Sequence, residues 1–194
     1  SPTSNPLSVT GPVGTKKFVD ATLKALEIDI SYRLTHHDDL EAGPEIVTAE
    51  FAQGVLYDGD GVTITAEPTD HRPVHPSLGF RVDAQGKSVV IAGDTVPCEG
   101  LDRLCKDADL LVQTVVRESL VKAVPSQRFQ DILDYHSTTT DAGQTAARGE
   151  VKTLVLNHCV PSPAPGAEDE WIAEANAHFT GKILVANDLL KISV

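Results

Sequence analysis

Short apolar runs alternate with helical segments in the second half of the chain, and this alternation limits the choice of fold most. Residues 110–116 and 153–156 are apolar runs of strand length. Residues 100–106 and 138–148 have helical patterns and lie between such runs. Alternation of this kind is typical of α/β layered folds. We therefore predict an α/β protein.

Periodicity and turn residues predict the remaining elements. Apolar side chains at three- and four-residue spacing favour a helix over residues 16–26, and a last helix is expected over residues 168–179. The Pro- and Gly-rich residues 1–14 predict a loop. Strands are predicted where β-branched residues cluster, over residues 46–51, 62–66, 78–82, 88–92, 182–186 and 189–194.

Length and composition indicate one soluble globular domain over residues 1–194. The chain has 194 residues and is 41% hydrophobic, which suffices for a core. It has neither an apolar stretch of membrane-spanning length nor a recognisable signal peptide, so we expect no membrane partner and a cytoplasmic location. The absence of Met predicts that Ser1 is not the start of the gene product. Three cysteines at no zinc-finger spacing predict reduced structural thiols.

The net charge bears on the class of partner. The formal charge is −12 at pH 7. Affinity for nucleic acid rests largely on Lys and Arg side chains that neutralise phosphates. The composition therefore disfavours a nucleic-acid partner, although a local basic stripe is compatible with a negative total.

Two side chains with metal-binding chemistry follow apolar strands. Asp94 comes directly after residues 89–93, and His158 ends the run 153–158. The carboxyl ends of strands are where α/β folds place their sites, and imidazole and carboxylate groups bind Zn²⁺, Fe or Mn. Taken alone, Gly-Asp-Thr is also typical of a turn in which Asp bonds the backbone.

Further candidates lie in loops. His71 and His75 belong to a Pro-rich segment, and His136 precedes the helix predicted over residues 138–148. His136 suits a proton donor or a stabiliser of developing negative charge. Glu118 follows the strand 110–116 and suits a carboxylate that orients an imidazole. Each of these segments is also compatible with a polar surface loop.

Together these segments resemble the metallo-β-lactamase superfamily, within it the ribonuclease Z-like and arylsulfatase-like hydrolases. The resemblance covers nearly the whole chain and rests on motifs in the family's order. They are Gly11-Pro-Val-Gly-Thr15, Ala92-Gly-Asp-Thr95, Ala108-Asp-Leu-Leu-Val112, His136-Ser-Thr-Thr139 and Lys152-Thr-Leu-Val-Leu-Asn-His158. The resemblance implies a four-layer αββα sandwich, of which this chain supplies the larger, C-terminal part.

The resemblance also implies roles for individual residues. Asp94 would bridge two Zn²⁺ ions, with Mn or Fe as alternatives, while His158 and His71 each bind one ion and His75 is the alternative to His71. Glu118 and His136 would act beside the leaving group. A metal-bridging hydroxide would attack the substrate. The family's HxHxDH motif and N-terminal strands are absent from the sequence, so we expect an N-terminal segment or a partner chain to supply them.

One departure from the family bears on the substrate. Ribonucleases that process transfer RNA often carry a long arm between two of these strands, where this chain has only residues 83–87. Together with the acidic composition, this favours a small-molecule substrate with an ester, phosphodiester, sulfate, lactone or activated aryl halide bond. The alternatives are a ribonuclease Z-type tRNA 3′-endonuclease and a non-catalytic fragment or binding subunit. Homo-oligomerisation is compatible with the sequence.

Overall fold

The computed structural model describes residues 6–194 and divides the chain into two compact units. The first is Ser1–Ala52 and the second is Gln53–Val194. Each unit is described by itself below.

The first unit contains two parallel strands and two helices. Strand β1 (Leu7–Gly11) pairs with β2 (Ile46–Glu50), and the helices α1 (Thr15–Ala25) and α2 (Glu27–His36) form the connection between them. A crossover of this kind is what parallel pairing requires. The predicted helix over residues 16–26 and the predicted strand over residues 46–51 are confirmed. Within the predicted N-terminal loop, residues 7–11 form a strand instead, and residues 1–5 lie outside the described residues.

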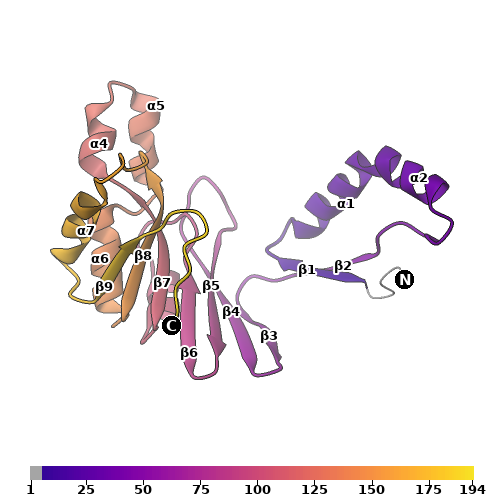
Figure 1. Cartoon of the computed structure of the whole chain (residues 1–194), viewed down its shortest axis with the longest axis horizontal. Coiled ribbons are helices and arrows are strands. Elements are labelled where there is room, and N and C mark those ends of the chain that lie inside the picture. Colours follow the sequence, from indigo (N-terminus) through magenta and orange to yellow (C-terminus); the bar gives the residue numbers. More distant parts are fainter. Residues whose placement is uncertain (1–5) are drawn as a thin grey trace. The chain divides into compact units, whose positions relative to one another are not determined.

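The second unit is built on a seven-stranded sheet whose strands follow one another in sequence order (Figure 1). The first four strands pair antiparallel, and the last four pair parallel. The strands are β3 (Gly54–Gly59), β4 (Val62–Pro68), β5 (Leu78–Ala84), β6 (Lys87–Ile91), β7 (Leu110–Val116), β8 (Thr153–Val160) and β9 (Lys182–Val185). Because β6, β7 and β8 are parallel, their carboxyl ends lie at the same edge of the sheet.

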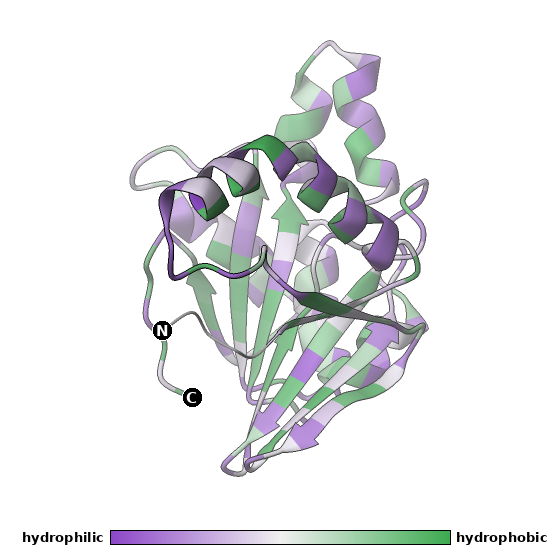
Figure 2. Ribbon diagram, turned by 90° about the vertical axis from the view of Figure 1, so that its right-hand side faces the viewer, coloured by the Kyte–Doolittle hydropathy of each residue, from purple (hydrophilic) through white to green (hydrophobic). Residues whose placement is uncertain are grey.

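Helices cover the sheet and close its core. Helix α3 (Glu99–Cys105) packs on β4 and β5, α6 (Thr139–Arg148) packs on β7 and β8, and α7 (Glu168–Asn176) packs on β9 and α6. Hydrophobic residues concentrate in the strands of this unit (Figure 2). The largest fully buried side chains include Leu101, Leu104, Leu111, Leu154, Leu156 and Trp171. The predicted α/β class is therefore confirmed.

Short helices fill the connection between β7 and α6. They are α4 (Glu118–Ala123), α5 (Gln127–Gln130) and the 3₁₀ helix η1 (Asp131–Asp134). These helices are too short for a helical spacing of apolar residues to be recognised in the sequence. Helix α6 then begins with a capping box, in which Thr138 and Asp141 satisfy each other's backbone amides.

The predicted strands of the second unit are confirmed, with one exception. The prediction of a strand over residues 189–194 is wrong, because this segment has no regular structure and Leu189 is 95% exposed. Its apolar residues therefore have no core to pack against. All three cysteines are free thiols, as predicted. Among residues 6–194, no helix is long and apolar enough to cross a membrane.

A buried carboxylate stabilises the amino end of β7, and we expect it to make unfolding sensitive to acid. The Lys152 ammonium lies 2.7 Å from the Asp109 carboxylate, which also accepts the Ser88 amide at 2.9 Å. The Lys152 hydrogen bond, followed by that from Ser88, lowers the pKa of Asp109 to about 2. An unfolded Asp titrates near pH ~3.9. The stabilisation is therefore complete above pH ~4 and is lost as pH falls toward ~2.

Asp109→Asn should accordingly lower the free energy of unfolding at pH 7. The difference in this free energy between variant and wild type should shrink as pH falls to ~2. Urea titrations at several pH values measure this. Asp107→Asn is the matched control, because Asp107 is exposed and precedes Asp109 by two residues. Wild-type and Asp109→Asn curves that stay parallel over the whole pH range would contradict the assignment.

Candidate metal centre

The candidate site lies at the sheet edge formed by the carboxyl ends of β6, β7 and β8. Asp94 follows β6 after Gly93, whose φ of 66° is in the left-handed region. Glycine adopts this conformation without strain, and here it turns the chain out of the strand. The Asp94 side chain is 37% exposed, so the carboxylate is accessible at this edge.

A bulge in β8 directs His158 toward the same edge. Thr114 pairs with Asn157 and Val116 pairs with Val160, so one residue of β7 lies opposite His158 and Cys159 together. Bulges bend a strand and redirect side chains, often next to active sites. His158 has a φ of 44°, an uncommon conformation for a residue with a side chain.

Backbone carbonyls fix the orientation of two further imidazoles. The Nδ1 atom of His71 lies 2.8 Å from the Tyr135 carbonyl oxygen, and the Nδ1 atom of His136 lies 3.0 Å from the Ile132 carbonyl oxygen. A carbonyl only accepts hydrogen bonds, so each Nδ1 carries the proton and donates it. In the neutral ring, each Nε2 then keeps a free lone pair, which is the form that binds metal.

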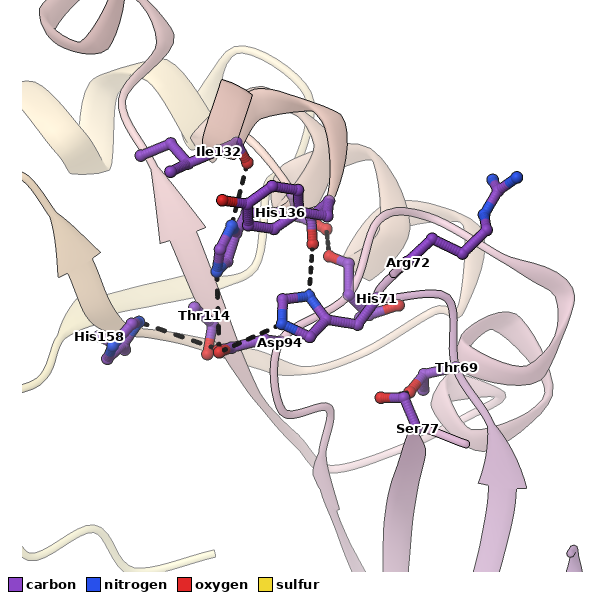
Figure 3. A network of polar contacts seen from close by, with 12 residues as sticks. Thr69, His71, Arg72, Ser77, Asp94, Thr114, Ile132, His136 and His158 are labelled. Atoms are coloured by element: carbon purple, nitrogen blue, oxygen red, sulfur yellow. Dashed lines mark hydrogen bonds and ion pairs between the residues drawn. The ribbon is translucent and has the colours of Figure 1, made fainter. Parts of the chain in front are cut away.

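The three imidazoles converge on the Asp94 carboxylate (Figure 3). The His71 Nε2 and His136 Nε2 atoms lie 4.0 and 3.7 Å from Asp94 Oδ2. His158 Nδ1 lies 3.9 Å from the other oxygen, Oδ1. Candidate ligand atoms of His71, Asp94 and His136 all lie within 4.8 Å of one another. These separations exceed hydrogen-bond lengths and leave room for an ion between the groups.

The donor set suits a metal ion of intermediate softness. Neutral imidazole nitrogens and carboxylate oxygens bind Zn²⁺ at about 2.0–2.2 Å. The carbonyl partners of His71 and His136 are the usual support for ligating histidines. Cys159 is next to His158, but burial raises the pKa of its thiol to about 11, so it stays protonated at neutral pH and is a poor ligand.

Two predicted site residues lie elsewhere. His75, the alternative to His71, is exposed, whereas the His71 ring faces Asp94. Glu118 is the first residue of α4, and its carboxylate accepts a hydrogen bond from Lys122 at 2.6 Å. Among the described residues, no hydrogen bond or ion pair joins Glu118 to His136.

Thr114 is a residue that the sequence reasoning missed. Figure 3 places it beside Asp94, and its burial is nearly complete at 4% exposure. Thr114 belongs to the part of β7 that pairs with Asn157, directly before His158. Its position near the end of a predicted strand was the only signal available, because Thr is common in strands.

Comparison with known proteins identifies the family. No family model matches the chain. The ribonuclease Z of Mycobacterium tuberculosis (strain H37Ra) is 51% identical over 189 residues, which are 97% of this chain and 69% of that protein. The ribonuclease Z of Mycobacterium avium (strain 104) is 50% identical over 194 residues, which are 100% of this chain and 69% of that protein. The chain belongs to the ribonuclease Z family.

Solved structures agree on the fold. The short form of human tRNase Z has a TM-score of 0.64 and 22% identity, covering 98% of this chain and 69% of that one. The metallo-β-lactamase-fold protein YhfI from Bacillus subtilis has a TM-score of 0.62 and 21% identity, covering 94% and 63%. Zn²⁺-bound PqqB from Methylobacterium extorquens has a TM-score of 0.61 and 16% identity, covering 97% and 63%. This member of the ribonuclease Z family is therefore a metal-dependent hydrolase with the metallo-β-lactamase fold, as the resemblance implied.

The substrate prediction is wrong. Relatives that match 97% of the chain are ribonucleases by name, which contradicts both the small-molecule substrate and the expectation that a nucleic-acid partner is disfavoured. The net charge of −12 is a sum over the whole chain and does not determine the electrostatic potential at the sheet edge that carries the site.

Proposed function

We propose that this ribonuclease Z-family protein is a metal-dependent endonuclease that cleaves precursor tRNA at the 3′ end. The observation that carries the proposal is the convergence of His71, His136 and His158 on Asp94 in a chain that is 51% identical to a ribonuclease Z. The name of the human structural neighbour, tRNase Z, supports tRNA as the substrate.

A pair of Zn²⁺ ions would fit the placement of the two Asp94 oxygens. Oδ2 faces His71 and Oδ1 faces His158. Asp94 would therefore be shared between the ions, with His71 serving one and His158 the other. Bound metal lowers the pKa of water and polarises the scissile phosphodiester.

His136 would act on the leaving oxygen. It is buried, its Nδ1 proton is held by the Ile132 carbonyl, and its Nε2 lies at 3.7 Å from Asp94 Oδ2. This arrangement directs Nε2 to the edge where the phosphodiester must lie. In the doubly protonated ring, which carries a second proton on Nε2, His136 would give that proton to the departing 3′ oxygen and return to the neutral form with Nδ1 still bonded to the Ile132 carbonyl.

Cleavage of a labelled tRNA that carries a 3′ extension tests the proposal. We expect the purified, zinc-loaded protein to release the extension by one cut next to the acceptor stem. A chelator should abolish the cut, and added Zn²⁺ or Mn²⁺ should restore it. Because RNA contacts release counterions, the affinity should fall as salt rises.

A tRNA without the extension is the matched control and should stay intact. Single-stranded RNA of the same length separates tRNA recognition from general nuclease activity. Metal-loaded protein that leaves the extended tRNA uncut would contradict the proposed function.

A further inference from the structure

Three residues of the candidate metal centre lie next in sequence to residues that are hydrogen-bonded to one another. We call Asp70, Thr95 and Ser137 the Thr95 cluster, because Thr95 contacts both of the others. Its members come from three separate segments of the chain. Asp70 precedes His71, Thr95 follows Asp94, and Ser137 follows His136.

Thr95 joins the Asp94 segment to the His71 segment. The Asp70 amide donates to Thr95 Oγ1 at 3.0 Å, and Thr95 Oγ1 donates to the Val96 carbonyl at 2.7 Å. The Val96 amide in turn donates to the Asp70 carbonyl at 2.9 Å. Thr95 is 0% exposed, so loss of its hydroxyl leaves the Asp70 amide without this acceptor in a part-buried place.

Ser137 joins the same segment to His136. Both its amide and its hydroxyl donate to the Thr95 carbonyl, at 2.8 and 2.7 Å. Gln113 of β7 supports Ser137, since its Nε2 donates to Ser137 Oγ at 3.3 Å. Ser137 and Gln113 are 1% and 0% exposed. Thr95, Ser137 and Gln113 are therefore part of the core, whereas the Asp70 side chain is 30% exposed.

The hydrogen bonds to Thr95 fix the positions of His71, Asp94 and His136 more firmly than contacts between these three side chains do. His71 Nε2 and His136 Nε2 lie 4.0 and 3.7 Å from Asp94 Oδ2, too far for direct hydrogen bonds. By contrast, Asp70, which precedes His71, and Ser137, which follows His136, are hydrogen-bonded to Thr95 at 2.7 to 3.0 Å. The preorganisation of the ligands thus depends on the cluster below them.

We infer that Thr95 is a positioning residue that holds His71, Asp94 and His136 at the spacing needed for metal binding. This role rests on the proposed function, because it requires these side chains to form the metal centre. Thr95 itself contacts neither metal nor RNA. Its hydroxyl accepts from the Asp70 amide, and its backbone carbonyl accepts from Ser137.

Thr95→Val tests the link to Asp70 and His71, because valine keeps the shape of threonine and removes Oγ1 but leaves the backbone carbonyl that accepts from Ser137. Zn²⁺ affinity is measured in chelator competition, and the visible spectrum of bound Co²⁺ reports the ligand geometry. We expect affinity to fall about 10- to 100-fold, the range for residues that support metal ligands. Thr95→Ser keeps the hydroxyl and should bind like wild type.

Thr145→Val is the matched control, since Thr145 of α6 is equally buried at 0% and belongs to another part of the core. It should lose stability without losing Zn²⁺ affinity. Ser137→Ala removes the hydroxyl that donates to the Thr95 carbonyl and should also weaken Zn²⁺ binding. It serves as the test if Thr95→Val does not fold. Folded Thr95→Val or Ser137→Ala with wild-type affinity and Co²⁺ spectrum would overturn the inference. A wild-type protein that binds no metal would instead overturn the proposed function on which it rests.

Discussion

Asp94→Ala should abolish cleavage of 3′-extended tRNA and weaken Zn²⁺ binding by more than about 100-fold. Loss of residues that only support ligands costs about 10- to 100-fold, and Asp94 is the group on which three imidazoles converge. The Asp94 side chain is 37% exposed and forms no hydrogen bond, within 3.5 Å, to any residue that the structure describes. The free energy of unfolding of the metal-free variant should therefore stay within about 0.5 kcal/mol of the wild-type value. Chelator competition and thermal unfolding of the metal-free protein measure the two effects separately.

Asp102→Ala is the control for removal of a surface carboxylate. The Asp102 side chain is 43% exposed and pairs with Arg148. It should leave both metal binding and cleavage unchanged. If Asp94→Ala kept full cleavage and its bound metal, the assignment of this sheet edge as the metal centre would be wrong.

His136→Ala should separate chemistry from metal binding. We expect the rate of the chemical step to fall about 10²- to 10⁴-fold, the range for loss of a general acid, while Zn²⁺ stays bound through His71, Asp94 and His158. Single-turnover cleavage and metal analysis of the same preparation measure both quantities. His178→Ala, which removes an exposed imidazole after α7, is the control.

The opposite outcome is equally informative. His136 belongs to the group whose candidate ligand atoms lie within 4.8 Å of one another. If His136→Ala lost Zn²⁺ as completely as Asp94→Ala, His136 would be a ligand and another group would have to protonate the leaving oxygen.

The sequence predicted the central part of the fold well. The strands around β7 are long apolar runs, and α6 has both a capping box and a regular period, so local signals agreed with the tertiary structure. The short helices α4 and α5 and the bulge in β8 escaped prediction. The helices are too short for a helical period to show in the sequence, and the bulge depends on the pairing of β7 with β8.

The candidate site was predictable where a ligand follows a strand. Asp94 and His158 were assigned from their positions at strand ends, and the structure brings them to one edge. Glu118 was chosen by the same rule, but it lies two residues beyond the end of β7 at Val116 and already belongs to a helix. The chain turns into α4 at Glu118, and Thr114 is the β7 residue beside Asp94 (Figure 3).

The buried support of the site was not predictable at all. Thr95 and Ser137 are common polar residues, and nothing in the sequence relates the segments that carry them. Only the three-dimensional structure shows the hydrogen bonds between them. Three expectations stay predictions: the single domain over residues 1–194, the supply of the HxHxDH motif by other residues, and homo-oligomerisation.

Metal content per chain tests the central claim most directly. Elemental mass spectrometry of freshly purified protein, after removal of loosely bound ions, should find zinc in stoichiometric amount in the wild type and none in Asp94→Ala. Folded wild-type protein that contains the residues supplying the predicted HxHxDH motif and still retains no metal, even after incubation with Zn²⁺, would contradict a metal centre that includes His71, Asp94 and His158.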